Sequence, residues 1–165
     1  MKFNFIVAFL TLFFTSSFGF AAGLNAVENE IVKNVESSSS DSLALLEKIV
    51  NIYSGSQNVE GVKKVGEIFR AEFEKLGFTT RWVKMPKEMN RADHLFAEHK
   101  GGTGQKVLIL GHLDTVFDKS DAFQKFRREG DVAYGPGVND MKGGLVAILF
   151  ALKAMEKAGA LKDAT

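Results

Sequence analysis

The sequence predicts an α/β fold, in which a mixed and mostly parallel sheet is flanked by helices. Segments with apolar residues at helical spacing alternate with short strand-like segments, and one of these is wholly apolar, as a buried central strand would be. Glycine-rich turns separate the elements. A composition of 45% hydrophobic and 25% charged residues over 165 positions is ordinary for a folded domain and excludes a disordered chain.

The first 21 residues have the pattern of a secretory signal peptide. Lys2 precedes an apolar run rich in phenylalanine, and no acidic residue occurs before Glu28. The run is short for a membrane span, and residues 19–21 (Gly-Phe-Ala) have the small-x-small pattern that signal peptidase recognises. We therefore expect cleavage after Ala21 or Ala22 and a secreted or periplasmic protein. An uncleaved membrane anchor is the alternative.

Residues 22–40 are interpreted as a linker, because they contain the serine run Ser37–Ser40 and few large apolar groups. The folded domain is expected over residues 41–165. Its first helix is predicted to be capped by Asp41 and to end near residues 54–55 (Ser-Gly), where the chain turns.

A second helix is predicted from Val59 to Leu76, with Gly77 placed for a left-handed end. Residues 78–82 alternate between apolar and more polar side chains and predict a half-exposed strand, in which Trp82 packs rather than binds a ligand. A further strand is expected over His94–Glu98.

A central strand is predicted at Val107–Leu110, which is wholly apolar and ends at Gly111. Residues that follow such a strand lie at its carboxyl end, where open α/β sheets build their sites. The last predicted element is a helix from Met141 to Lys157, with Gly159 just beyond it.

Charge and cysteine content narrow the function. The formal net charge is +1, and because acidic and basic residues are interspersed there is no basic stripe for nucleic acid. No membrane partner is expected once the signal peptide is removed. The chain has no cysteine, so any metal site must use histidine and carboxylate side chains.

The first candidate motif directly follows the predicted central strand and contains His112 and Asp114. Residues two apart in an extended segment face the same way, so the two side chains should share a task. A metal-bound imidazole is commonly oriented by a nearby acceptor, so His112 can be the ligand while Asp114 fixes its tautomer. Taken alone, this motif is better explained by two side chains that satisfy backbone groups of a loop.

The second candidate motif is Tyr134–Gly144, which leads into the last predicted helix. Gly135 and Gly137 flank a proline and make a tight turn, and Asp140 stands at the helix start. A carboxylate at that place can bridge two cations. The alternative is that Asp140 only caps the helix.

Together the two motifs resemble the dinuclear zinc family that includes glutamate carboxypeptidases, aminoacylases, acetylornithine and succinyl-diaminopimelate deacylases, and dipeptidases. The resemblance covers residues 41–160, and the sequence of Ala133–Gly137 resembles that of the glutamate carboxypeptidase branch. It implies that His112 ligates one zinc, that Asp140 bridges two, and that Asp114 is the catalytic aspartate orienting His112. The family also often has a cis peptide after the bridging aspartate.

The resemblance further implies two Zn²⁺ ions per complete site, although other divalent metals are possible. The chain would be the amino-terminal part of a zinc-exopeptidase-like catalytic domain. The general-base glutamate, the remaining ligands and a lid domain, through which the family often forms homodimers, would lie beyond it. The expected reaction is amide hydrolysis that releases a carboxy-terminal amino acid from a small peptide or N-acyl amino acid. We expect the isolated chain to be inactive.

Two alternatives remain open at this stage. The chain could be one half of an N-acyl-amino-acid deacylase that a second polypeptide completes, or a non-catalytic secreted binding domain that keeps the peptidase scaffold. His94 and His99 are predicted to be surface or core histidines rather than ligands. Lys142 is predicted to serve loop packing.

Overall fold

The computed structural model describes residues 23–164, so the predicted signal peptide lies outside the described residues. The helices are α1 (Ala26–Ser37), α2 (Ser39–Val50), α3 (Val59–Lys75) and α4 (Lys142–Lys157), with short 3-10 helices η1 (Lys87–Met89) and η2 (Leu161–Asp163). The strands are β1 (Thr79–Val83), β2 (His94–Glu98), β3 (Arg127–Glu129) and β4 (Val132–Tyr134). In this described part, no helix is both long enough and apolar enough to cross a membrane.

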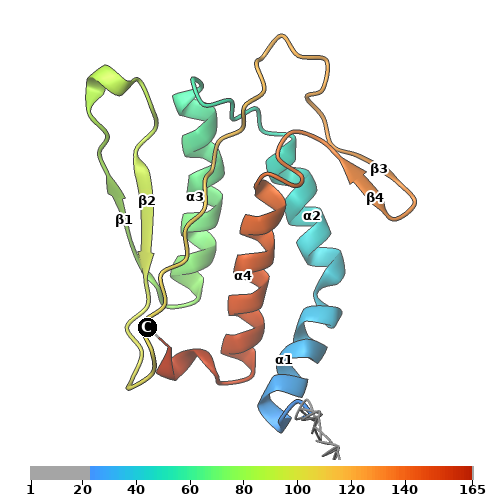
Figure 1. The fold of residues 1–165 in the computed structure, drawn as a ribbon, viewed down its shortest axis with the longest axis vertical. Helices are drawn as coiled ribbons and strands as arrows, with labels where there is room; N and C mark the ends of the chain where they lie inside the picture. Colours follow the sequence, from blue (N-terminus) through green and yellow to red (C-terminus); the bar gives the residue numbers. More distant parts are fainter. Residues whose placement is uncertain (1–22, 165) are drawn as a thin grey trace, which may run out of the picture.

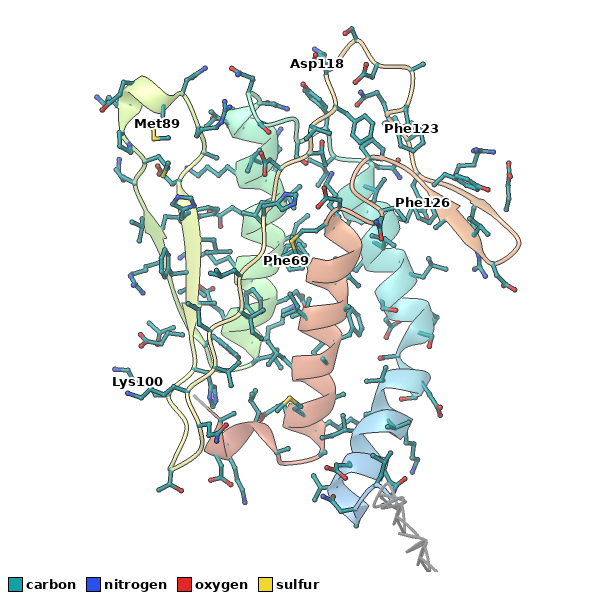
Figure 2. The ribbon with its side chains drawn as sticks, viewed as in Figure 1. Phe69, Met89, Lys100, Asp118, Phe123 and Phe126 are labelled. Atoms are coloured by element: carbon teal, nitrogen blue, oxygen red, sulfur yellow. The ribbon has the colours of Figure 1, made fainter. Side chains whose placement is uncertain are left out.

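The helix α4 is at the centre of the structure. It packs against α1 and α2 on one side and against α3 on the other, while the β1–β2 hairpin covers the far side of α3 (Figure 1). Figure 2 shows Phe69 between α3 and α4, where it is 1% exposed. The buried core cluster consists of Ile49, Val65, Phe69, Val146, Leu149 and Phe150. Burial of each such side chain contributes about 1.5–3 kcal/mol, so this helical core holds the site-bearing segments in place.

The predictions for α3, β1, β2 and α4 are confirmed, and each predicted end lies within one residue of the observed end. Gly77 follows α3 with a φ of 80°, as the predicted left-handed end requires. Trp82 packs across α3, since a Cβ on Gly66 would lie 2.4 Å from its ring. Its indole N–H donates to Glu67 Oε1 at 2.8 Å, which confirms a packing role.

Residues 26–37, inside the stretch expected to be a linker, form α1 instead. Asn25 and Glu28 make a capping box: the Glu28 N–H donates to Asn25 Oδ1 at 2.9 Å, and the Asn25 N–H donates to Glu28 Oε2 at 2.8 Å. The serine run breaks the helices only at Ser38, which lies between α1 and α2, and the hydroxyls of Ser37, Ser38 and Ser39 each donate to a carbonyl three residues earlier. The next helix, α2, therefore begins at Ser39 and not at a cap formed by Asp41.

The expected mostly parallel sheet is not observed. The strands form two antiparallel pairs, β1 with β2 and β3 with β4. Within residues 23–164, the parallel pairing is limited to an isolated bridge between Gly55 and Thr115. Antiparallel neighbours need only a local turn, whereas a parallel sheet needs strands brought together from distant parts of a chain.

The predicted central strand at Val107–Leu110 is not assigned as a strand. No strand of the described part pairs with it, so its side chains remain in solvent, with exposed fractions between 52% for Ile109 and 80% for Leu108. Four consecutive exposed apolar residues form a surface of the kind that promotes association between chains. The sequence pattern identified an apolar segment correctly but could not supply its neighbours.

We predict that the chain self-associates through Val107–Leu110. Leu108→Lys should lower the associated fraction, because a charge interrupts the apolar segment, and should change the free energy of unfolding by under about 0.5 kcal/mol, as is usual at exposed positions. Light scattering across a concentration series measures the association. Val132→Lys, at another exposed apolar position, is the matched control. Equal effects of the two substitutions would contradict the prediction.

Candidate metal site

The structure brings His112, Asp114 and Asp140 together. His112 Nε2 lies 2.9 Å from Asp140 Oδ1, although the two residues come from separate motifs. The other ring nitrogen, Nδ1, lies 3.0 Å from the Asp114 carbonyl oxygen and 3.2 Å from Asp114 Oδ1. Each ring nitrogen of His112 therefore faces a different aspartate, and the motifs predicted from the sequence form one site.

The position of Asp140 depends on the residue that follows it. Met141 is the N-cap residue of α4 and makes no side-chain capping bond, so Asp140 does not cap the helix. The Asp140 side chain is 78% exposed and turns toward His112 instead. The peptide bond between Asp140 and Met141 is cis, and the His112 N–H donates to Met141 Sδ at 3.3 Å. Met141 thus ties the helix start to the segment that carries His112.

The electrostatics of the site favour a positive charge on or beside the imidazole. Burial alone would lower the pKa of His112, but the contacts with Asp140 and Asp114 outweigh it and raise the pKa. In the protonated form both ring nitrogens donate, one to each aspartate. A divalent cation bound at Nε2 would replace one of these protons and keep the positive charge that the carboxylates attract.

The donor chemistry fits part of a zinc site. An imidazole nitrogen and a carboxylate oxygen are ordinary zinc ligands, and those of His112 and Asp140 lie 2.9 Å apart. Across residues 23–164, however, no group of three or more histidine, cysteine or acidic side chains could hold a metal ion. A catalytic zinc usually has three protein ligands, so the described residues supply a partial set.

Ser56 is a site residue that the sequence analysis missed. Its hydroxyl donates to Asp114 Oδ2 from 58 positions earlier in the chain. A serine beside a glycine predicts only an ordinary turn, so no local sequence pattern indicated that Ser56 belongs to the site. Ser56, His112 and Asp114 line one cavity of about 250 Å³, which His94 at the start of β2 also lines.

The other histidines are not ligands in this arrangement. His94 begins β2 and is exposed, as predicted for a surface residue. His99 Nδ1 lies 3.0 Å from the Ala164 carbonyl oxygen, and its ring packs 5.1 Å from the ring of Phe78. Both positions are consistent with structural roles.

Lys142 does more than pack a loop. Its side chain is fully buried, and Nζ donates to the carbonyl oxygens of Ile49 and Ile52, both at 2.9 Å. These carbonyls lie at the carboxyl end of α2, where a cation also interacts favourably with the helix dipole. Burial lowers the pKa of Lys142 to about 8. The lysine thereby links the start of α4, beside Asp140, to the end of α2.

Gly137 explains the shape of the turn that precedes Asp140. Its φ of 78° is in the left-handed region, and a Cβ there would lie 2.9 Å from Thr115 Cγ2 and 3.1 Å from Lys142 Cγ. The turn therefore packs directly on Thr115, the neighbour of Asp114, and on the stem of Lys142. A side chain at this position would separate the two motifs.

Comparisons with known proteins agree with the motif pattern. The sequence model of peptidase family M20/M25/M40 matches residues 108–165. Carboxypeptidase G2 from Pseudomonas sp. (strain RS-16) is 41% identical over 115 residues, which are 69% of this chain and 28% of that protein. The N-formyl-4-amino-5-aminomethyl-2-methylpyrimidine deformylase of Halalkalibacterium halodurans is 29% identical over 140 residues, 79% of this chain and 32% of that protein.

Among solved structures, the dipeptidase Dug1p from Saccharomyces cerevisiae has a similar fold. It superposes with a TM-score of 0.65 at 16% sequence identity, over 81% of this chain and 32% of that chain. The chain thus spans 28% and 32% of the lengths of the two curated relatives named above.

We predict that Lys142→Met lowers the free energy of unfolding by about 1–3 kcal/mol, because the thioether fills similar space but leaves the Ile52 carbonyl without its buried donor. Urea denaturation measures the change. The control is Lys153→Met on the same helix, where the lysine is 34% exposed and pairs with Glu72, so that a loss under about 1 kcal/mol is expected. An unchanged unfolding midpoint for Lys142→Met would show that the two hydrogen bonds contribute nothing net.

Proposed function

We propose that this chain supplies the first zinc ligands of an amide hydrolase, which is supported by the match of residues 108–165 to peptidase family M20/M25/M40 and by the 41% identity to a carboxypeptidase. In this proposal His112 and Asp140 would be zinc ligands, Asp140 for both ions of a complete site, and Asp114 would orient His112. The observation that carries the proposal is the convergence of His112 Nε2 and Asp140 Oδ1 at 2.9 Å, with Asp114 on the opposite side of the ring.

Zinc, when bound, supplies a Lewis acid for the amide carbonyl and lowers the pKa of its water. The residues of this chain bind and orient. The His112 Nδ1–H would donate to Asp114, through the carbonyl oxygen at 3.0 Å with Oδ1 at 3.2 Å, which favours the tautomer that leaves the Nε2 lone pair for the metal. Asp140 presents its carboxylate from an exposed position, where both oxygens can be reached. The ligands that complete the coordination would come from outside the described residues.

For the substrate, we propose a peptide or N-acyl amino acid from which a carboxy-terminal residue is released. The support is the 41% identity to a carboxypeptidase over 115 residues. An N-acyl deacylase is the second candidate, supported by the similarity to a deformylase. Release of a free carboxy-terminal amino acid from a peptide or N-acyl amino acid, or of a carboxylic acid and a simple amine from an N-acyl amine, distinguishes the two when the products are separated by chromatography.

We also propose that the protein is secreted or periplasmic, on the pattern of residues 1–21. Amino-terminal sequencing of the exported protein should give a chain that begins at Ala22 or Gly23. A protein that keeps Lys2 and fractionates with membranes would support an uncleaved anchor instead.

The test of the hydrolase proposal uses the whole polypeptide that the gene encodes, loaded with zinc. His112→Ala and Asp140→Asn should lose bound zinc and hydrolysis together, because each removes a ligand. Asp114→Asn should keep most of the zinc and lower turnover by about 10–100-fold, the usual effect of losing the partner of a metal-bound histidine. Zinc content is measured by atomic emission and hydrolysis by product release.

His99→Ala and Asp131→Asn are matched controls of the same residue types, and both should retain zinc and activity. Full zinc content in His112→Ala would overturn the assignment of the ligand. If the whole polypeptide bound no zinc and hydrolysed neither peptides nor N-acyl substrates, the non-catalytic binding domain would replace the hydrolase as the proposed function.

A further inference from the structure

We propose that Ser56 is a positioning residue of the site, which holds the Asp114 carboxylate so that its other oxygen remains aimed at His112. This inference rests on the proposed function, because it assigns Ser56 a role in presenting His112 to a metal. It adds a residue that lies in neither sequence motif.

The backbone on both sides of the contact is fixed. The Thr115 N–H donates to the Ser54 carbonyl oxygen at 2.9 Å, and the Ser56 N–H donates to the Thr115 carbonyl oxygen at 3.0 Å. These two bonds form the isolated parallel bridge between Gly55 and Thr115. The Ser56 side chain is therefore placed by backbone pairing and not by a freely moving loop.

Gly55 shows how closely the two segments approach. A Cβ at this position would lie 2.5 Å from the Phe117 carbonyl oxygen and 2.6 Å from the Tyr53 hydroxyl oxygen, so a side chain there would push the segments apart. The close approach leaves Ser56 directly beside Asp114, and its hydroxyl donates to Asp114 Oδ2 with a longer contact of 3.3 Å to the Thr115 carbonyl oxygen.

The two oxygens of the Asp114 carboxylate have different partners. Oδ2 accepts from Ser56, while Oδ1 lies 3.2 Å from His112 Nδ1. The terminal torsion of an aspartate is broad, and the Asp114 side chain is 32% exposed, so water would compete for both oxygens if the hydroxyl were removed. A hydrogen bond from a neutral hydroxyl to an ionised carboxylate is strong enough to select one orientation.

His112 Nδ1 faces the Asp114 carbonyl oxygen at 3.0 Å and Oδ1 at 3.2 Å, whereas Nε2 faces Asp140 Oδ1 at 2.9 Å. A fixed Oδ1 therefore adds to the carbonyl oxygen in favouring the proton on Nδ1 over the competing tautomer, and a proton on Nδ1 leaves Nε2 free for a metal. Ser56 thus acts on the metal ligand through Asp114 and does not contact the metal position itself. Replacement of Ser56 should alter the tautomer of His112 even in the metal-free protein, a change that general destabilisation would not produce.

The experiment compares Ser56→Ala, Ser56→Thr and the control Ser42→Ala, whose hydroxyl bonds only within α2. In the metal-free protein at alkaline pH, ¹⁵N NMR reports the tautomer of each histidine, and His112→Ala assigns the signals. We expect Ser56→Ala to lower the population with the proton on Nδ1, whereas Ser56→Thr and Ser42→Ala should match the unaltered protein.

Zinc titration provides the second measurement. Ser56→Ala should weaken zinc affinity by about tenfold, the low end of the effect of residues that orient a metal-bound histidine. Because Ser56 acts through Asp114, the double variant Ser56→Ala/Asp114→Asn should bind no more weakly than Asp114→Asn alone.

An unchanged tautomer and zinc affinity in Ser56→Ala would overturn the proposal. Additive losses in the double variant would also overturn it, since Ser56 would then act by another route. If Ser56→Ala does not fold, Ser56→Thr and Ser56→Cys decide the matter, because only the hydroxyl should preserve the tautomer. Wild-type zinc affinity in His112→Ala would instead contradict the proposed function, which separates the two failures.

Discussion

The site depends on the short segment from Ile49 to Ser56, which joins both motifs to the helical core. Its first carbonyls accept from the buried Nζ of Lys142, which belongs to the second motif. Its last residues pair with Thr115 and contact Asp114 in the first motif. One segment therefore fixes the relative position of two motifs that lie far apart in the sequence, and neither motif alone contains the information that brings them together.

The helical core makes this arrangement rigid. Ile49 is fully buried in the cluster with Val65, Phe69 and Leu149, so the carbonyl end of α2 cannot shift without opening the core. Lys142 extends from the first turn of α4 to that fixed end, and Gly137 allows the preceding turn to rest on the lysine stem. The stabilisation of the core by apolar burial is thus transmitted to Asp140 through one buried amine and one close backbone contact.

Elements marked by apolar periodicity or by a terminating glycine were predictable from the sequence, and the long-range contacts were not. The spacing of apolar residues defined α3 and α4, and Gly77 marked the end of α3, because these signals are local. The motifs around His112 and Asp140 were identified for the same reason. The serine run at Ser37–Ser40 marked only the break at Ser38 between α1 and α2 and not a linker, because its hydroxyls donate to carbonyls within the helical turns. The roles of Ser56 and of the carbonyl groups that bind Lys142 could not be predicted from the sequence, because these contacts form only when segments far apart in the chain come together.

The exposed apolar segment Val107–Leu110 lies directly before His112 in the chain, so the surroundings of the segment and of the candidate site are linked. The segment leads directly into His112, so a strand that paired with it in parallel would bring its carboxyl end to the same edge as His112. Pairing of the segment and completion of the coordination are then coupled, because a ligand carried on a neighbouring strand reaches the site only when that strand is in register. The arrangement of His112, Asp114 and Asp140 does not depend on this step. It is set by contacts within residues 23–164, where two carboxylates around one imidazole favour a positive charge.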